Sequence, residues 1–185
     1  MDSIKNILIG GEKGIGKTYL VHKLIEQLQG KKNIKGYFTL MHKDKIDQEL
    51  NGHEIYIYPA ELSIENRKED QSNLIGCSDG KTRKINTNVF KTLGVELLSN
   101  YDDSSVVIMD EIGFFESDIV KFTSKVFEAL ESNSKCIVVV KEKYDNEYIN
   151  KVREYKEKEN TIFVQLTKEN RDEVFTLLEK IVKAW

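Results

Sequence analysis

The segment from Gly11 to Thr18 constrains this chain more than any other, because it joins an apolar strand pattern to an amphipathic helix pattern. Its sequence follows the pattern G-x-x-x-x-G-K-S/T. Glycines let backbone N–H groups converge on phosphate oxygens, and the N-terminus of the following helix adds partial positive charge. We therefore expect the whole loop to bind a phosphate-bearing ligand through Gly11, Glu12, Lys13, Gly14, Ile15, Gly16, Lys17 and Thr18.

Two side chains of this loop have roles that follow from their chemistry. Lys17 is expected to reach the β- and γ-phosphates of a nucleoside triphosphate, and the Thr18 hydroxyl is expected to ligate Mg²⁺. Glu12, Lys13 and Ile15 occupy variable positions of the pattern, so they are expected to line the ligand without individual roles. The alternative, a glycine-rich turn with a surface lysine, leaves the flanking strand and helix unexplained.

Strand-like and helix-like patterns alternate along most of the chain, which predicts an α/β fold with a largely parallel central sheet. The expected strands cover residues 4–9, 36–41, 106–109, 135–140 and 161–166. The expected helices cover residues 17–29, 88–101, 117–131, 145–158 and 168–183. The apolar runs in the third and fourth strands lack polar alternation, so helices are expected on both faces of the sheet.

The region 43–85 has a different pattern. Residues 53–58 alternate as a half-exposed strand does, and residues 73–78 are an expected partner, with a polar loop at 65–71 between them. Because no Pro-rich linker divides the chain, we expect a single domain over residues 1–185, with this region as a small antiparallel insertion beside the phosphate loop.

Two adjacent carboxylates, Asp110 and Glu111, follow the apolar run at 106–109. The carboxyl ends of parallel strands meet at the ligand-binding edge of an open α/β sheet, which places this pair beside the phosphate loop. Asp110 is expected to hold Mg²⁺ through a water, and Glu111 to orient or deprotonate the water that attacks the γ-phosphate. The alternative for Glu111 is a loop carboxylate or a helix cap.

A third candidate, Arg171, lies near the start of the last helix, for which Thr167 is the expected N-cap. An arginine in a first helical turn opposes the helix dipole. Its guanidinium therefore either points to the γ-phosphate or pairs with Asp172 or Glu169, and the local sequence does not separate these alternatives.

Basic and aromatic residues of the middle region receive structural interpretations. Solvated positions are expected for Arg67, Lys68, Lys81, Arg83 and Lys84, although they could also form a patch for an anionic second substrate. Packing in the core or at its rim is expected for Tyr56, Tyr58, Phe114 and Phe115, rather than stacking on a nucleobase.

Composition limits the class of protein. The net charge of −3 gives no argument for nucleic-acid binding, and no stretch reaches the ~20 apolar residues of a membrane helix. Residues 1–5 lead into a strand without the apolar core of a signal peptide, and two distant cysteines do not form a disulfide framework. We expect a cytoplasmic protein; the sequence does not identify a protein partner.

The chain resembles the cancer-related nucleoside-triphosphatases, which are small phosphate-loop NTPases. The matching segments follow the family's order and span most of the chain: Gly-Ile-Gly-Lys-Thr at 14–18, Gly-Tyr-Phe-Thr at 36–39, Asp-Glu-Ile-Gly at 110–113 with Glu116, and Leu-Thr-Lys-Glu-Asn-Arg-Asp at 166–172. The resemblance implies the P-loop NTPase fold and slow, Mg²⁺-dependent hydrolysis of several nucleoside triphosphates, including ATP and GTP. It also favours a functional Arg171 and adds Glu116 as a secondary candidate.

This chain departs from the family after residue 140, where Lys141-Glu142-Lys143 replaces a basic His-Arg segment, and it matches the family loosely over residues 43–85. Two alternatives to hydrolysis therefore stay open. One is a nucleotide or small-molecule kinase whose acceptor is held by residues 43–90. The other is a switch in which a bound nucleotide controls docking of a partner protein.

Overall fold

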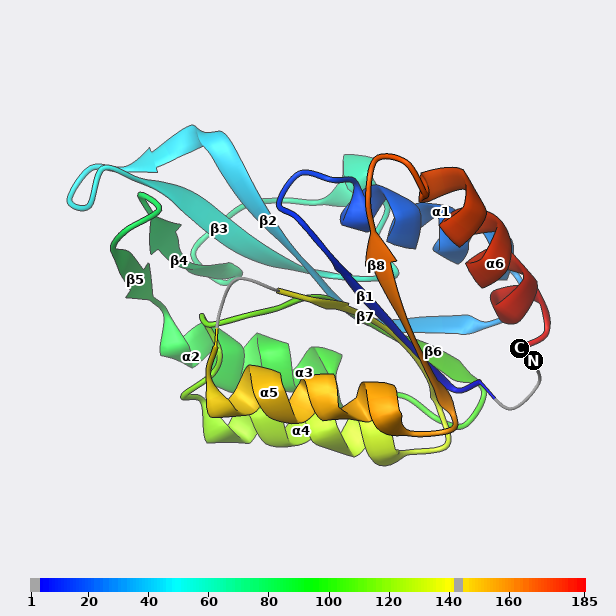
Figure 1. Cartoon of the computed structure of the whole chain (residues 1–185). Coiled ribbons are helices and arrows are strands. Elements are labelled where there is room, and N and C mark those ends of the chain that lie inside the picture. The colour runs from blue at the N-terminus through cyan, green and yellow to red at the C-terminus, as the bar shows by residue number, and fades with distance from the viewer. Residues whose placement is uncertain (1–3, 142–144) are drawn as a thin grey trace.

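The computed structural model describes residues 4–141 and 145–185. Two short segments lie outside the described ranges, residues 1–3 and residues 142–144. The first belongs to the N-terminal segment considered above, and the second includes most of the altered basic segment. The strands of the described part form one eight-stranded sheet in the order β5-β4-β3-β2-β6-β7-β1-β8 (Figure 1). None of the helices in these ranges is long and apolar enough to cross a membrane.

The parallel part of the sheet contains the strands expected from the apolar runs. Its strands are β1 (Asn6–Gly11), β2 (Asn33–Asp47), β6 (Ser105–Ile112), β7 (Lys135–Val140) and β8 (Thr161–Leu166). β1 pairs in parallel with β7 and β8, and β6 pairs in parallel with β2 and β7. Every residue of β1 is buried, as is nearly all of β6 and β7, because helices cover both faces.

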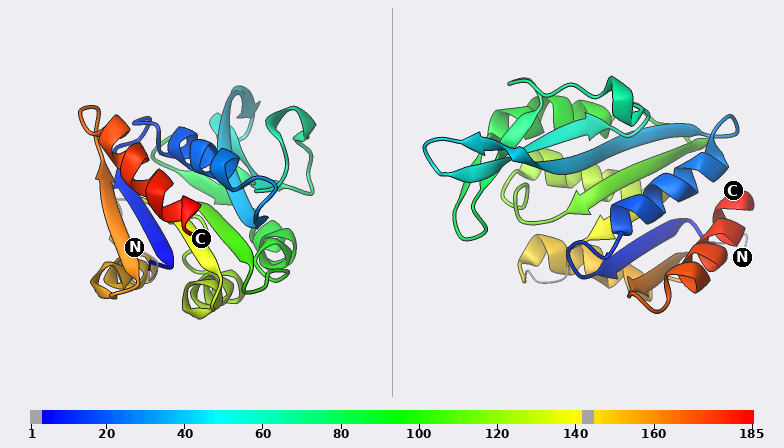
Figure 2. Two further views of the ribbon diagram at one scale, coloured as in Figure 1. Left: turned by 90° about the vertical axis from the view of Figure 1, so that its right-hand side faces the viewer. Right: turned by 90° about the horizontal axis from the view of Figure 1, so that it is seen from above.

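The helical segments divide between the two faces of this sheet. They are α1 (Lys17–Leu28), α2 (Thr87–Val89), the π-helical turn η2 (Phe90–Gly94), α3 (Val95–Leu97), α4 (Val120–Glu131), α5 (Glu147–Glu154), the 3₁₀ turn η3 (Tyr155–Glu157) and α6 (Arg171–Lys183). α1 and α6 lie on one face, whereas α2, α3, α4 and α5 lie on the other (Figures 1 and 2). Each face has its own apolar core, so the predicted mostly parallel sheet with helices on both faces is confirmed.

The antiparallel part extends the sheet beyond β2. It consists of β3 (Gly52–Pro59), β4 (Leu74–Ser78) and β5 (Arg83–Ile85), with the 3₁₀ turn η1 (Ile64–Asn66) in the connection after β3. β2 pairs with β3, β3 with β4 and β4 with β5, all antiparallel. The expected pairing of residues 53–58 with 73–78 is therefore present, and the long β2 joins the two parts of the sheet (Figure 1).

Gly36 allows the close approach of β2 to the strand that carries the acidic pair. Its φ of +93° is a conformation that other residues rarely adopt, and a Cβ there would lie 1.9 Å from the Ile108 carbonyl oxygen. The register that follows pairs Phe38 with Asp110. The first residue of the Gly-Tyr-Phe-Thr segment is therefore required by packing between strands.

The last helix begins later than its sequence pattern predicts. Asn170, not Thr167, is the N-cap, so that expectation was wrong. The Asn170 side chain accepts a hydrogen bond from the Thr167 N–H at 2.8 Å and donates one to the Gln165 carbonyl at 2.8 Å. This side chain closes the turn between β8 and α6, which leaves Arg171 as the first helical residue.

Candidate functional site

The phosphate loop connects the end of β1 to the start of α1. Gly14 and Gly16 have φ values of 79° and 106°, and Gly16 is the N-cap of α1 without a side-chain cap. Glycine is the residue that takes such backbone angles without strain. The N-terminus of α1 has no side-chain cap, so its first N–H groups are available to an anion beside the loop.

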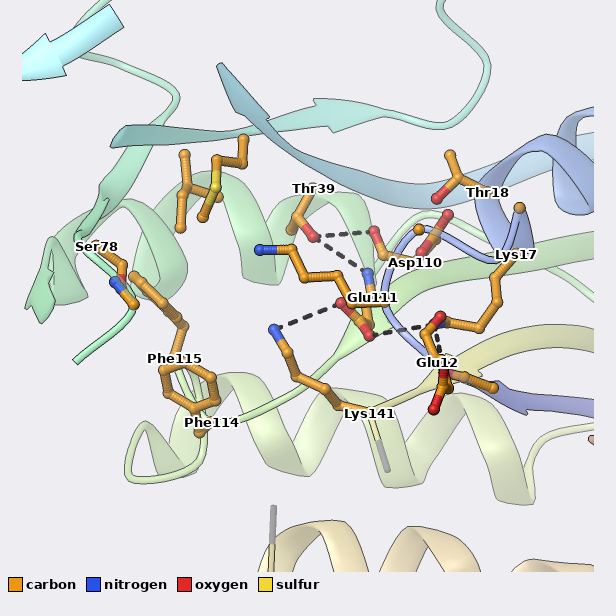
Figure 3. Close-up of a pocket in the computed structure, with 17 residues that line it drawn as sticks. Glu12, Lys17, Thr18, Thr39, Ser78, Asp110, Glu111, Phe114, Phe115 and Lys141 are labelled. Atoms are coloured by element: carbon orange, nitrogen blue, oxygen red, sulfur yellow. Dashed lines mark hydrogen bonds and ion pairs between the residues drawn. The ribbon is translucent and has the colours of Figure 1, made fainter. Parts of the chain in front are cut away.

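Lys17 is the first residue of α1 and is only 8% exposed. Its Nζ donates hydrogen bonds to the Gly11 carbonyl at 2.7 Å and the Glu12 carbonyl at 3.0 Å. The same ammonium group lies 4.0 Å from Glu111 Oε1 (Figure 3). The side chain therefore folds over the loop and places a shielded positive charge where phosphates would bind.

Asp110 lies in β6 and is only 2% exposed. Burial raises the pKa of its carboxyl group to about 7, and a hydrogen bond with Thr18 is the largest opposing effect. Its Oδ2 is buried without a hydrogen-bond partner among the described residues. A buried carboxylate oxygen without a partner, next to a hydroxyl, is an environment that a bound cation would stabilise.

These two oxygen groups fit Mg²⁺ rather than a metal held by protein ligands alone. The described residues contain no group of three or more His, Cys, Asp or Glu side chains that could hold a metal. Mg²⁺ is usually bound through one or two protein groups, with waters and substrate phosphates completing its shell. Thr18 and Asp110 supply that kind of partial site.

Glu111 lies between two lysines at the border of the loop. Its Oε1 is 4.0 Å from Lys17 Nζ and its Oε2 is 3.5 Å from Lys141 Nζ (Figure 3). Lys141 follows β7 directly, and its stem packs over Gly113, where a Cβ would lie 3.3 Å from Lys141 Cδ. The carboxylate is thus held between two cationic groups at the edge of the phosphate loop.

Thr39, at the end of the parallel section of β2, fixes the backbone of the acidic pair. Its hydroxyl donates to the Asp110 carbonyl at 3.2 Å and accepts from the Glu111 N–H at 3.2 Å. Sequence reasoning assigned no role to Thr39 or to Lys141. Thr39 ends the Gly-Tyr-Phe-Thr segment and Lys141 begins the altered basic segment, so the sequence marked both positions, but only the fold shows their contacts.

Glu116 holds the turn that follows the acidic pair. It is 3% exposed, and its Oε1 accepts a hydrogen bond from the Gly113 N–H at 2.6 Å. Burial raises the pKa of its carboxyl group to about 7, against the opposing hydrogen bond from Gly113. Within the described ranges Glu116 does not line the pocket, so its geometry is that of a residue that closes the turn after Glu111.

Arg171 is exposed at the first position of α6 and is not among the described residues that line the pocket. The turn that precedes it does run beside the phosphate loop, because Leu166 pairs with Gly11. The structure therefore brings Lys17, Thr18, Asp110 and Glu111 together and places Arg171 at the periphery of this group.

Arg67 is not the solvated side chain that its charged surroundings predicted. Its guanidinium carbon lies 5.1 Å from the centre of the Phe38 ring and 5.4 Å from that of Tyr58. Its Nε and Nη2 atoms are buried without partners among the described residues. The expectation was wrong because the aromatic faces of β2 and β3 offer this side chain a cation–π site.

One pocket of ≈ 480 Å³ contains these groups and extends past them. One side is the phosphate loop with Lys17 and Thr18, and Asp110 and Glu111 lie at its middle. The other side is formed by β2, β3, the β4–β5 turn and the segment after β6, including Phe114 and Phe115 (Figure 3).

Comparison with known proteins gives one consistent result. A model of the family described as NTPase matches residues 6–182. The nucleoside-triphosphatase THEP1 of Aquifex aeolicus is 29% identical over 184 residues, which cover 94% of this chain and 99% of that protein. The THEP1 of Methanocaldococcus jannaschii is 28% identical over 184 residues, covering 95% and 96% of the two chains.

The fold is also found in a solved structure. The crystal structure of THEP1 from Aquifex aeolicus superimposes with a TM-score of 0.71 at 24% sequence identity and covers 96% of this chain and 99% of that chain. At this identity the likeness concerns the fold alone.

Proposed function

Because this chain belongs to the NTPase family and is a nucleoside triphosphatase, we propose that it performs Mg²⁺-dependent hydrolysis with Glu111 as the base. The observation that carries the proposal is the position of Glu111, held between Lys17 and Lys141 and adjacent to Asp110. A carboxylate in that position can accept a proton from an attacking water. The water oxygen forms a bond to the γ-phosphorus and the nucleoside diphosphate leaves, so the products are a nucleoside diphosphate and inorganic phosphate.

The phosphate loop supplies most of the charge stabilisation in this proposal. Phosphoryl transfer depends mainly on positioning and on electrostatic stabilisation of the transferred group. Lys17 contacts the β- and γ-phosphates once its hydrogen bonds to the loop carbonyls exchange for phosphate oxygens. The N–H groups between Gly11 and Thr18 surround the same oxygens.

Thr18 and Asp110 would hold the Mg²⁺ ion. The unpartnered buried oxygen of Asp110 supports this assignment, since a cation there favours the ionised carboxylate. Mg²⁺ would neutralise the charge that develops on the phosphates. We also propose that Arg171 turns toward the γ-phosphate, because its turn runs beside Gly11.

The substrate range in this proposal is broad and includes ATP and GTP. The motif residues recognise phosphates, which all nucleoside triphosphates share. We place the protein in a reducing cytoplasm, which agrees with two free and buried cysteines, Cys77 and Cys136.

A turnover assay with ATP, GTP, CTP and UTP, each with and without Mg²⁺, tests this function. We expect inorganic phosphate from at least ATP and GTP without any added acceptor, and loss of turnover when EDTA removes the metal. Phosphate release that is insensitive to EDTA would contradict the metal role. Absence of phosphate release from all four nucleotides would contradict hydrolysis itself.

A further inference from the structure

The pocket has a second half, which hydrolysis does not require. This distal half is lined by Met41, Ile55, Ser78, Gly80, Phe115 and Lys141. These residues come from β2, β3, the β4–β5 turn, the segment after β6 and the end of β7. Ser78, Phe115 and Lys141 lie across Glu111 from the phosphate loop (Figure 3).

The position of Glu111 determines what kind of molecule can occupy the distal half. In phosphoryl transfer the attacking and leaving oxygens lie roughly in line on opposite sides of the phosphorus. Lys17, on one side of Glu111, belongs to the half that binds the triphosphate, and Lys141 lies on the other side at 3.5 Å. The distal half is therefore on the side of the nucleophile, and the nucleoside lies on the opposite side.

The size of the pocket exceeds what a water nucleophile requires. A single water occupies about 30 Å³ in the liquid. The pocket measures ≈ 480 Å³ over both halves, and this volume is shared between the phosphates beside the loop and the occupant of the distal half. The distal half adds walls from β2, β3, β4, the β4–β5 turn and the segments after β6 and β7, and an attacking water requires none of these walls.

The residues that line the distal half favour a ligand that has an apolar portion and a negative charge. Met41, Ile55 and Phe115 present apolar surface, and Met41 is 37% exposed. The hydroxyl of Ser78 already donates to the Thr82 carbonyl and accepts from the Gly80 N–H. Polar recognition in the distal half therefore falls to the cationic groups at its edge.

Two cationic side chains at this edge, Lys141 and Arg83, contact the same aromatic ring, that of Phe114. Lys141 Nζ lies 4.8 Å from the centre of the Phe114 ring, and the guanidinium carbon of Arg83 lies 4.5 Å from it. Arg83 is not among the described residues that line the pocket, but it pairs with Ser78 across the β4–β5 ladder and its guanidinium contacts Phe114, and both of these residues line the pocket. An anionic group of an occupant would meet these two side chains.

We propose that the distal half binds a small anionic alcohol with an apolar or aromatic body, which accepts the γ-phosphoryl group in place of water. The hydroxyl oxygen forms a bond to the γ-phosphorus, the bond from that phosphorus to the bridging oxygen breaks, and Glu111 takes the hydroxyl proton. The products are a phosphate ester and a nucleoside diphosphate. This inference rests on the proposed role of Glu111 as the base.

The test follows the γ-phosphoryl group with labelled Mg²⁺–ATP and four acceptor probes. 4-(Hydroxymethyl)benzoate carries a ring, a hydroxyl and a carboxylate, and benzyl alcohol lacks only the carboxylate. Glycerol 3-phosphate and glycerol form a matched pair without a ring. We expect labelled ester from the two anionic probes, at least tenfold more than from their neutral partners, with the aromatic anion ahead.

Two variants connect this transfer to the distal half. Arg83→Gln should raise the concentration of 4-(hydroxymethyl)benzoate needed for half-maximal ester formation at least tenfold. Met41→Trp should fill the distal half and abolish ester formation. Arg83→Gln, whose side chain is not among the described residues that line the pocket, should release phosphate from ATP at the wild-type rate without acceptor. Ile46→Trp places the same bulk at an exposed residue of β2 outside the pocket and should change neither reaction.

Label found only in inorganic phosphate with all four probes would overturn the proposal while leaving hydrolysis intact. Equal ester formation by Met41→Trp and wild type would also overturn it, since transfer would then take place elsewhere. Failure to release phosphate in the absence of any acceptor would instead contradict the proposed hydrolytic function.

Discussion

The parallel and antiparallel parts of the sheet differ in how their sequences encode them. The parallel strands β1, β6 and β7 are buried on both faces and read as continuous apolar runs. The antiparallel strand β3 alternates, with Ile55 and Ile57 facing one core while Tyr56 and Tyr58 face the loop after β3. One part is covered by helices on both faces, whereas the other depends on polar and aromatic contacts with a loop.

This difference corresponds to a division of chemistry. The phosphate loop and the acidic pair come from the parallel part, where motifs have fixed spacing. The distal half of the pocket takes Ile55, Ser78 and Gly80 from the antiparallel part. We infer that the parallel part carries phosphate chemistry and that the antiparallel part determines what lies on the nucleophile's side of the γ-phosphate.

The largest effect is expected from Lys17→Ala in the parallel part. Loss of a shielded cation at the β- and γ-phosphates should reduce turnover by ~10³-fold and weaken triphosphate binding far more than nucleoside binding. Phosphate release and nucleotide titration measure both effects, with Lys31→Ala at an exposed position after α1 as the control. Unchanged turnover in a folded Lys17→Ala protein would remove the phosphate loop from the mechanism.

Arg171→Ala tests whether the periphery of the parallel part takes part in catalysis. If its guanidinium reaches the γ-phosphate, as we propose, turnover should fall by ~10³-fold with the melting temperature largely preserved. Arg171→Lys should recover little of this loss, because the planar fork is absent. Wild-type turnover in Arg171→Ala would assign the residue to the exposed surface where the structure shows it.

Glu116→Gln should change how stability depends on pH. Burial raises the folded-state pKa of Glu116 to about 7 from 4.5, so the folded protein favours the protonated acid. The contribution of the Glu116 carboxyl group to the free energy of unfolding is fully present below pH 4.5. As the pH rises through 7 this contribution is lost, and the free energy of unfolding falls by up to about 3 kcal/mol. Denaturant unfolding between pH 4 and 8 should show a shallower slope for Glu116→Gln. If the pH dependence of the free energy of unfolding were the same in Glu116→Gln, in wild type and in the exposed control Glu26→Gln, the buried acid would not be its source.

Tyr58→Phe should have the smallest effect and should be confined to the antiparallel part. The Tyr58 hydroxyl lies 2.9 Å from His42 Nε2 and donates to Glu69 Oε1 at 2.9 Å, so its loss should lower the free energy of unfolding by ~1–2 kcal/mol. Tyr148→Phe, in α5, removes a buried hydroxyl without a partner among the described residues, and should cost nothing. Equal costs for the two variants would show that the polar contacts do not hold the antiparallel part.

The sequence predicts the parallel part well because its signals are local. A strand, three glycines and a helix define the phosphate loop. An apolar run predicts the strand that places Asp110 and Glu111 at the same edge of the sheet. The start of α6 was misplaced because Asn170 closes the preceding turn through contacts that a cap pattern does not specify.

The remaining parts of the site depend on contacts between distant segments. Thr39 meets the acidic pair 71 residues away in the sequence, and only the register of β2 with β6 shows it. Arg67 is half-buried because two strands present aromatic rings to it, although its own neighbours are charged. Such positions carry no periodic signal, so they become visible only with the fold.

The most direct measurement for the central claim compares Glu111→Gln with wild type in Mg²⁺–ATP binding and in single-turnover hydrolysis. The neutral amide keeps the shape of the side chain between Lys17 and Lys141 but cannot accept the proton. We predict binding within about twofold of wild type, since the loop and the metal site stay intact, and a hydrolytic rate reduced by ~10²–10⁴. A Glu111→Gln protein that binds and hydrolyses ATP as wild type does would show that this carboxylate is structural.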